Sequence, residues 1–267
     1  MRVRAPGSSA NLGPGFDVLG LAVARYVWAN DEGQGTHCGP DHIARIAYEQ
    51  AGGSRELWFD FELEPGRGLG FSAAARAAGA TLANLQAGYA LVDAQHWAYQ
   101  VVADLEGHGD NAAPCVFGGM YIIAGEVYHR LAKSLPGDLL FWMPELETST
   151  DHSRLALAPD ISRSDAVFNL GRLGLLMAAV YEQRLDLLST ATQDRLHQPP
   201  RFIDCEPAAK AYEIALQAGA AAAWLSGSGP TVAVVVDDRT KVAVVNALTE
   251  SGKVLELAVD QQGAVPV

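Results

Sequence analysis

The stretch from residue 57 to residue 86 constrains the fold more than any other part of the chain. It begins with LWFDFELE (57–64), in which apolar residues at every second position give the period of a strand with one buried face. A glycine-rich loop, PGRGLG, follows, and SAAARAAGATLANLQ then continues as a helix for which Ser72 is the expected N-cap. Such an arrangement can point several backbone N–H groups, and the positive end of a helix dipole, at one spot.

This loop fits two interpretations, a phosphate site or a tight turn that carries a helix into the core. It is not a Walker loop, because no Lys-Ser or Lys-Thr pair ends it, and its spacing differs from the Rossmann fingerprint. If it binds phosphates, the donors are backbone amides, so the Phe71 ring can point away while its amide faces the anion. Charge neutralisation would then need a metal ion; Mg²⁺ held by Ser72 and Glu106 is one solution, and a solvated helix-end carboxylate is the alternative for Glu106.

Further loops concentrate hydrogen-bonding groups between the predicted elements. In chain order they are SSANLGPGFD with Asn11 and Asp17, EGHGDN (106–111), DRLHQPPR with Arg195, His197 and Arg201, and LSGSGP (225–230). Loops of this kind are usually surface turns, but ligand sites are also found on loops that a rigid scaffold positions. An arginine beside a rigid proline pair can clamp a carboxylate with two hydrogen bonds.

The remaining periodicity predicts an interleaved set of helices and strands. Helices are expected at 41–52 with Asp41 as N-cap, about 93–106 with Trp97 among its core residues, 164–183, 186–194, 206–218 and 240–251; strands are expected at GGMYIIAG, DLLFWMP and in AAAWLSGSGPTVAVVV. The glycine-rich segments 5–20 and 31–40 are expected to be loops. Strict βαβ repeats are absent, which favours a two-layer α+β plan.

Composition narrows the class of protein. The 267 residues are 49% hydrophobic, enough for a substantial core, and carry a net charge of −12, which argues against nucleic acid or an anionic membrane as a partner. No apolar run matches a signal peptide or a membrane span, so a cytoplasmic location is expected. Cys38, Cys115 and Cys205 lack the spacing of a zinc site or a redox motif and are expected to be buried free thiols.

Six ordered segments together resemble a known family. APGSSANLGPGFDVLGLAV, PGRGLGFSAAA, EGHGDNAAPCVFGG, SDAVFNLGRLGLLMAA, DRLHQPPR and LSGSGPTVAVVV are similar, in this order, to the motifs of homoserine kinases within the superfamily of galacto-, homoserine, mevalonate and phosphomevalonate kinases (GHMP kinases). The resemblance implies an α+β fold with an N-terminal domain of the ribosomal-protein-S5-like type (1–137) and a C-terminal ferredoxin-like domain (138–267). It also implies transfer of the γ-phosphoryl of ATP to the hydroxyl of L-homoserine, with Mg²⁺, in threonine biosynthesis. A homodimer is a further possibility.

The resemblance also implies roles for individual residues. The triphosphate would lie against Gly66, Arg67, Gly68, Leu69, Gly70, Phe71, Ser72 and Ala73, with Mg²⁺ on Ser72 and Glu106. The amino acid would lie among Asn11, Asp17, His108, Asp110, Arg154 and Arg201, of which the two arginines would receive its carboxylate. Asn111, Arg154 and Arg201 are the candidate catalytic residues. The catalytic base stays unassigned, since phosphoryl transfer depends mainly on positioning and charge neutralisation.

Three features depart from the family pattern, all on the nucleotide side. Phe71 replaces the first serine of the usual GLGSSAA loop, the segment between Gly20 and Gly66 is shortened, and His42 stands where relatives usually have an asparagine. Two alternatives to a homoserine kinase therefore stay open. One is a GHMP-fold protein that binds an amino acid with little or no catalysis, and the other is a kinase for another small hydroxylated acceptor.

Overall fold

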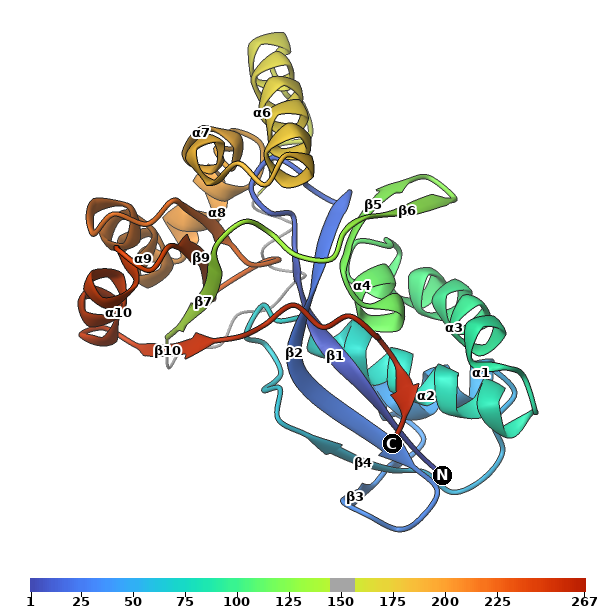
Figure 1. Cartoon of the computed structure of the whole chain (residues 1–267). Coiled ribbons are helices and arrows are strands. Elements are labelled where there is room, and N and C mark those ends of the chain that lie inside the picture. The colour runs from blue at the N-terminus through green and yellow to red at the C-terminus, as the bar shows by residue number, and fades with distance from the viewer. Residues whose placement is uncertain (145–156) are drawn as a thin grey trace.

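The chain folds around two antiparallel sheets, as the computed structural model of residues 1–144 and 157–267 shows (Figure 1). The first sheet has the order β11-β1-β2-β4-β3, with β5 also paired to β2 and β6 paired to β5. Its strands are β1 (Arg2–Ala10), β2 (Leu19–Asn30), β3 (Thr36–His37), β4 (Trp58–Phe61), β5 (Met120–Ala124), β6 (Val127–Ala132) and β11 (Val265–Pro266). The second sheet, of order β10-β7-β9-β8, contains β7 (Asp138–Met143), β8 (Ala222–Leu225), β9 (Val232–Val236) and β10 (Lys253–Glu256).

Helices cover both sheets. Against the first sheet pack α2 (Phe71–Gln86) and α4 (Ala112–Phe117), and α1 (Ile43–Gln50) and α3 (Leu91–Glu106) pack against α2. The second half of the chain contributes α6 (Arg163–Tyr181), the 3₁₀ turn η1 (Leu185–Leu187), α7 (Leu188–Ala191), α8 (Gln198–Asp204), α9 (Glu206–Gln217) and α10 (Lys241–Thr249). The α+β prediction is therefore confirmed. Among the described residues, no helix combines the length and apolar character needed to cross a bilayer.

Alanine lets α2 lie deep in the protein. Eleven of its sixteen residues are buried, and it packs against α1 and β1. A Cβ on Gly79 would lie 2.2 Å from the carbonyl oxygen of Ala44 in α1, so only glycine permits the observed approach of the two helices. The small side chains place the N-terminal end of α2 next to the strands that carry the polar loops.

The second sheet divides its side chains between two apolar clusters. Along β9, Val232, Val234 and Val236 belong to a cluster with α9 and α10, whereas Ala233 and Val235 belong to the main core. This alternation follows from the two-residue period of a strand. Because both faces are covered, β9 reads in the sequence as a continuous apolar run.

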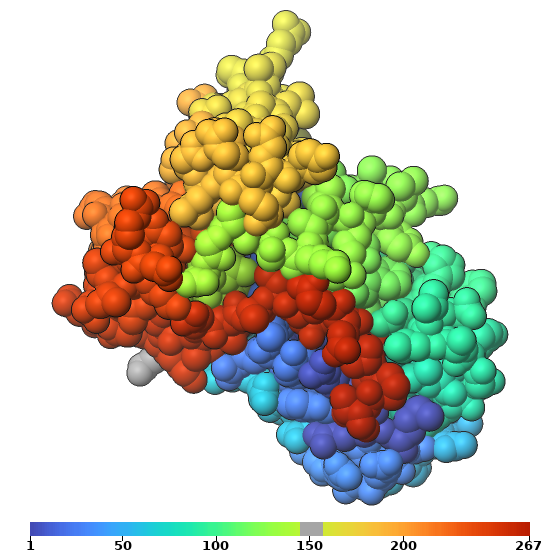
Figure 2. Space-filling view, in the orientation of Figure 1, coloured from blue at the N-terminus to red at the C-terminus, as the bar shows by residue number. Residues whose placement is uncertain are grey.

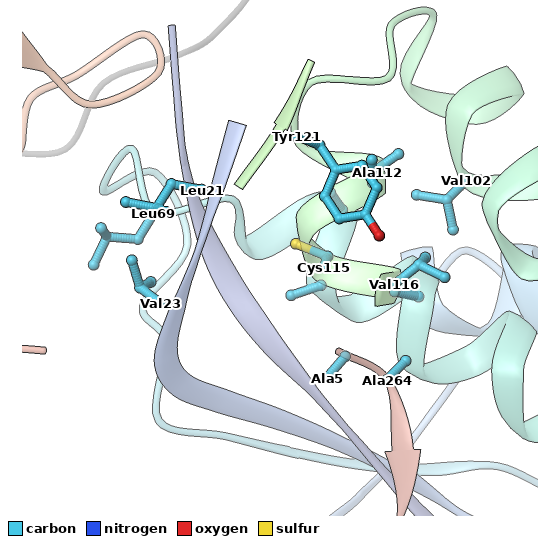
Figure 3. Close-up of a cluster of buried hydrophobic side chains, with 14 of the residues drawn as sticks. Ala5, Leu21, Val23, Leu69, Val102, Ala112, Cys115, Val116, Tyr121 and Ala264 are labelled. Carbon is cyan, nitrogen blue, oxygen red and sulfur yellow. The ribbon is translucent and has the colours of Figure 1, made fainter. Parts of the chain in front are cut away.

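The C-terminal end returns to the first sheet. After β10 the chain runs back across the N-terminal part of the molecule, as the red segment of Figure 2 shows, and Val265 and Pro266 pair with Arg4 and Val3. Ala264 is fully buried and its N–H donates to Val116 O at 3.0 Å, next to Ala5 in the core (Figure 3). The division into 1–137 and 138–267 stays a prediction, and β11 is a part of the second segment that pairs with the first.

Several predicted details were wrong. Residues 5–10 belong to β1, which accommodates Pro6 and Gly7 through a shift of register between them, and residues 19–20 begin β2. A Cβ on Gly7 would lie 2.7 Å from Leu69 O, which explains why a glycine is needed in this strand. The sequence showed the glycine but not the neighbouring loop that requires it.

Two helix caps and one core residue were also misassigned. The N-cap of α2 is Gly70, not Ser72, and the N-cap of α1 is His42, whose Nδ1 accepts a hydrogen bond from Ala44 N, rather than Asp41. Trp97 is 51% exposed, because α3 turns Ala94, Ala98 and Val102 toward the core instead. Cys38 and Cys115 are buried free thiols as expected, while Cys205 is free but only partly buried.

Candidate active site

The glycine loop before α2 depends on backbone conformations that other residues rarely adopt. Gly66, Gly68 and Gly70 have φ values of 70°, 70° and 67°, in the left-handed region that favours glycine. A Cβ on Gly68 would lie 2.6 Å from Ser226 O, and one on Gly70 would lie 2.0 Å from Ser8 Oγ. The loop is therefore both tightly turned and closely packed, and it opens α2 with the free N–H groups of its first turn.

Leu69 anchors this loop from inside. Its side chain is 2% exposed and lies beside Leu21 and Val23 of β2, as Figure 3 shows. Its carbonyl oxygen accepts a hydrogen bond of 3.0 Å from Ser8 N. Burial of this leucine holds the two flanking glycines at the surface of the cavity.

A loop from the second half of the chain supports the glycine loop. Ser226 Oγ donates to Gly68 O at 2.7 Å and lies 2.8 Å from Ser9 Oγ, and Gly227 N donates to Ala10 O at 3.2 Å. The SGSGP segment, which follows β8, therefore contacts the glycine loop directly.

Phe71 turns its ring toward other aromatic residues. The ring forms edge-to-face contacts with Phe59 and Phe61 of β4, with centroid distances of 6.0 and 5.7 Å. His42 extends this cluster through its contact with Phe59 at 4.8 Å, and burial lowers the pKa of the His42 imidazole. The bulky residue in the loop is therefore held by its neighbours on β4, although it also contributes to the cavity wall.

Ser72 and Glu106 come together although they are far apart in the sequence. Ser72 Oγ, in the first turn of α2, donates to Glu106 Oε1 at 2.7 Å, and Arg76 Nη1 forms an ion pair with the same oxygen. Glu106 is the last residue of α3, which ends because Gly107 takes the left-handed conformation with φ of 76°. A hydroxyl and a carboxylate at a helix N-terminus are hard oxygen donors, so the residues present fit Mg²⁺ beside bound phosphates.

The three acidic and imidazole groups predicted to face the acceptor form one cluster. Ligand atoms of Asp17, His108 and Asp110 all lie within 4.8 Å of one another, and His108 Nδ1 makes a short hydrogen bond to Asp110 Oδ1. Asp110 is 2% exposed, and the backbone N–H of Asn111 donates a hydrogen bond of 2.9 Å to the same Oδ1 atom. The structure therefore joins the EGHGDN loop to the loop after β1.

Asn11 and Asn111 have structural partners in addition to their predicted roles. Asn11 has a φ of 74°. Its side-chain oxygen accepts a hydrogen bond of 3.1 Å from Asp17 N, and its side-chain nitrogen donates one of 3.0 Å to Gly227 O. Asn111 Oδ1 accepts from Ser8 Oγ at 2.8 Å, next to Gly70. Asn11 therefore links the loop after β1 to the 227–229 turn, and Asn111 links the EGHGDN loop to β1.

Arg201 reaches the same region from α8. Its guanidinium donates to Gly227 O at 3.1 Å and lies 3.0 Å from His197 Nδ1, while its residue is only 5% exposed. Its guanidinium carbon lies 5.3 Å from the centre of the Phe16 ring, which stacks on His197. Arg154, the other predicted arginine, lies outside the described residues.

His197 is a residue that sequence reasoning did not assign to the site. It is fully buried, Nε2 lies 2.8 Å from Gly13 O, and burial lowers its pKa to about 4, with Arg201 acting in the same direction and Asp194 opposing. A neutral ring that donates from Nε2 to Gly13 accepts the Arg201 hydrogen bond at Nδ1.

Asp194 and Asn169 hold the segment that carries His197 and were also missed. Asp194 accepts from His197 N and Gln198 N at 2.9 and 2.8 Å, and Asn169 Nδ2 donates to it at 2.6 Å. The clustering of polar residues in DRLHQPPR was the available signal, but the partner on α6 could not be found from spacing.

One cavity joins the two halves of the site. A volume of about 370 Å³ is lined by the glycine loop, the start of α2, Glu106, His108, Asn111 and the 227–229 turn. A larger hollow of about 750 Å³ lies on the far side of Arg67, whose guanidinium binds Glu64 and Pro144 O. Apart from Arg67, none of the candidate residues in the described part of the chain lines that second hollow, so the smaller cavity is the candidate active site.

The fold and this cavity, with a glycine loop at a helix N-terminus and a polar loop lining the same volume, define a class of protein, the small-molecule kinases. Comparison with known proteins agrees. Residues 41–119 match the family model "GHMP kinases N terminal domain", and residues 176–254 match "GHMP kinases C terminal". The chain belongs to the GHMP kinase family, and it is an ATP-dependent kinase that uses Mg²⁺.

Within that family, the similarity over the whole chain is to homoserine kinases. The chain is 36% identical to the homoserine kinase of Desulfitobacterium hafniense, with 100% of both sequences covered, and 35% identical to that of Thermus thermophilus, with 93% and 91% covered. The crystal structure of homoserine kinase from Cytophaga hutchinsonii superposes with a TM-score of 0.85 at 25% identity, covering 100% of this chain and 97% of the other.

Proposed function

We propose that the chain transfers the γ-phosphoryl of ATP to the side-chain hydroxyl of L-homoserine, giving O-phospho-L-homoserine, a step of threonine biosynthesis. The observation that carries this proposal is the shared cavity, in which the glycine loop and the acceptor groups His108 and Asn111 line the same volume. A nucleotide tail and a small acceptor could meet there without crossing the protein. The full-length similarity to homoserine kinases supports homoserine as the acceptor.

On this proposal the nucleotide tail lies against the backbone of residues 66–73. The open N–H groups of the first turn of α2 favour a phosphate through both hydrogen bonding and the helix dipole. Ser72 and Glu106 would hold Mg²⁺, which would supply neutralisation of the phosphate charge when bound. The chain's own contribution is to fix these donors, since Leu69 and Ser226 leave the loop little freedom to move.

The acceptor would lie across the cavity. An amino acid needs anionic partners for its ammonium and a cationic partner for its carboxylate, and Asp17, Asp110 and Arg201 would supply these charges. Arg154 is proposed as a second carboxylate ligand, and His108 and Asn11 as further contacts. Asn111 is proposed to lie near the reacting hydroxyl, where its amide would orient the hydroxyl toward the phosphoryl group.

Most of the rate enhancement would come from positioning and charge neutralisation, which contribute without a strong base. The base stays unassigned, and proton loss assisted by the transferred phosphoryl group is compatible with the site.

We also propose that the protein acts in the cytoplasm, where ATP is supplied, and that it forms a homodimer.

A coupled assay of ADP release tests the proposed function. ADP should form only when homoserine is present, and Glu106→Gln and Ser72→Ala should each suppress turnover. Asp104→Asn, an exposed carboxylate on the same helix, is the matched control and should leave the rate unchanged. Nucleotide hydrolysis that is independent of homoserine and equal in all variants would contradict the proposal.

Calorimetry and an acceptor panel separate the proposal from its two alternatives. Homoserine binding without ATP binding would point to a protein that only binds the amino acid. Faster ADP release with another hydroxylated acid or amino acid than with homoserine would point to a different acceptor.

A further inference from the structure

Arg76 places a cation directly beside the candidate metal site. It lies on α2 four residues after Ser72, and therefore on the same helix face one turn further along. Its Nη1 forms an ion pair with Glu106 Oε1, the oxygen that also accepts the hydrogen bond from Ser72. The Arg76 side chain is 19% exposed and that of Glu106 is 12% exposed, so water screens the pair only partly.

The position of Arg76 is costly unless Glu106 holds it. Its Nε is buried and has no hydrogen-bond partner among the described residues. A guanidinium stays charged at any pH that the protein tolerates, and a charge that is largely removed from water is stable only when paired. Arg76 forms its ion pair with Glu106, so the two side chains fix each other's position.

This pairing changes what the carboxylate offers to a metal ion. Alone, Glu106 would present a full negative charge to Mg²⁺; paired, it presents a group whose charge Arg76 already offsets. Mg²⁺ gives up its water reluctantly and needs strongly anionic oxygens to do so. The phosphate oxygens of a bound nucleotide would supply the negative charge that the protein site itself lacks.

We propose that Arg76 is a positioning residue that makes metal binding depend on the nucleotide. It holds the Glu106 carboxylate in place before the metal arrives, and its charge keeps the affinity for free metal low. The divalent ion then binds together with the nucleotide instead of occupying the site alone. This inference rests on the proposed function, because it takes Ser72 and Glu106 as the metal ligands.

Binding of Mn²⁺ to the full chain without nucleotide tests the inference, with free Mn²⁺ measured by electron paramagnetic resonance. Arg76→Met keeps the length of the side chain but removes its charge, so we expect the dissociation constant for Mn²⁺ to fall by roughly one to three powers of ten, the range by which an adjacent arginine weakens the binding of another cation, the proton, to a carboxylate. Arg76→Lys keeps the charge and should bind Mn²⁺ as weakly as the wild type. Loss of structure alone would weaken Mn²⁺ binding, so an increase in affinity separates the two causes.

Unchanged or weaker Mn²⁺ binding by Arg76→Met would overturn the inference. The same holds if the gain persists in the double variant Arg76→Met/Glu106→Gln, because the ion would then bind elsewhere, for instance at the Asp17, His108 and Asp110 cluster. If circular dichroism shows that Arg76→Met does not fold, Arg76→Gln takes its place with the same expected result.

A parallel titration in the presence of ADP keeps this inference apart from the proposed function. Wild-type Mn²⁺ binding should then strengthen and should be lost in Glu106→Gln. Failure of that result contradicts the metal site itself, and with it the inference. If ADP promotes Mn²⁺ binding through Glu106 but Arg76→Met equals the wild type without nucleotide, only the role of Arg76 is contradicted.

Discussion

Ser226 Oγ donates a 2.7 Å hydrogen bond to the carbonyl oxygen of Gly68, and this contact joins two loops that are 158 residues apart. The Ser226 hydroxyl is buried with Ser9 Oγ and the Trp224 indole N–H around it. The bond occupies the Gly68 carbonyl with a partner from the second half of the chain and so fixes the conformation of the loop. The second half of the chain therefore helps to shape the phosphate loop without contributing a charge.

Gly68→Ala should impair nucleotide binding and turnover. A Cβ there would lie 2.6 Å from Ser226 O and 2.7 Å from Gly229 O, so one of the two loops must move. We expect kcat/KM for ATP to fall by about 100-fold, the scale of loss that a displacement of 1 Å produces in a site that works by positioning. Steady-state kinetics at saturating homoserine measure this change.

Gly88→Ala is the matched control for that variant. Gly88 has a similar left-handed φ of 92°, but nothing lies within 4 Å of its Cβ position. It should lose about 1 kcal/mol of stability from backbone strain and keep its kinetics. Equal kinetic losses in both variants would show that strain, rather than loop contact, is responsible.

Phe71 should contribute to stability through its aromatic neighbours. Its ring is 5.7 Å from that of Phe61 at an interplanar angle of 86°, the edge-to-face geometry that stabilises aromatic pairs. A double-mutant cycle of Phe71→Ala and Phe61→Ala, followed by urea unfolding, should give a coupling free energy of about 0.5–1.5 kcal/mol. Additive losses would mean that the ring is not held by this contact.

Sequence reasoning identified most of the regular elements because their periodicity is local. The strand, loop and helix around Gly66, Gly68 and Gly70 could be read directly, since alternation, glycine and alanine each have a physical cause in nearby residues. For the candidate site, the sequence indicated which loops carry polar residues but not which of these residues lie close together in space. That Ser72 meets Glu106, or that Asp17 meets His108, depends on how α2, α3 and β1 pack, and no local pattern contains that information.

The errors have the same origin. Ser72 is a good N-cap by type, but Gly70 provides the left-handed turn, and the Ser72 hydroxyl turns to Glu106 instead. Gly7 was assigned to a loop because glycine has a low preference for strands. It lies in β1 because any Cβ at this position would clash with Leu69 O. In each case a tertiary contact outweighed the local preference, as is common where a chain builds a site.

His197 should make the stability of the fold depend on pH. Its pKa in the folded protein is lowered from 6.5 to about 4, mainly by burial, so the unfolded chain binds a proton in this range while the folded chain does not. The contribution is fully present above pH 6.5 and is lost as the pH falls toward 4. Between these two pH values, this one group changes the free energy of unfolding by about 1.4 kcal/mol per pH unit.

Urea unfolding of wild type and His197→Gln between pH 4.5 and 7 measures this contribution as the difference between the two curves. The wild type should lose stability faster on acidification, and His129→Gln, at an exposed histidine in β6, should follow the wild type. Parallel curves for wild type and His197→Gln would show that the imidazole does not provide the linkage.

Asp110→Asn should weaken homoserine binding, because the variant loses a negative charge that would pair with the ammonium group of homoserine. Asp110 is 2% exposed and lies with Asp17 and His108 in a single cluster, so its charge acts at short range with little screening by water. Removing one partner of a buried charge pair costs about 2 kcal/mol or more, which corresponds to a roughly 30-fold higher dissociation constant. Calorimetric titration measures this dissociation constant, with Asp238→Asn, a change at an exposed carboxylate, as the control.

γ-Hydroxybutyrate, which lacks the ammonium but keeps the hydroxyl and carboxylate, should bind the wild type and Asp110→Asn equally weakly. An Asp110→Asn variant that still prefers homoserine over γ-hydroxybutyrate as strongly as the wild type does would show that another residue recognises the ammonium.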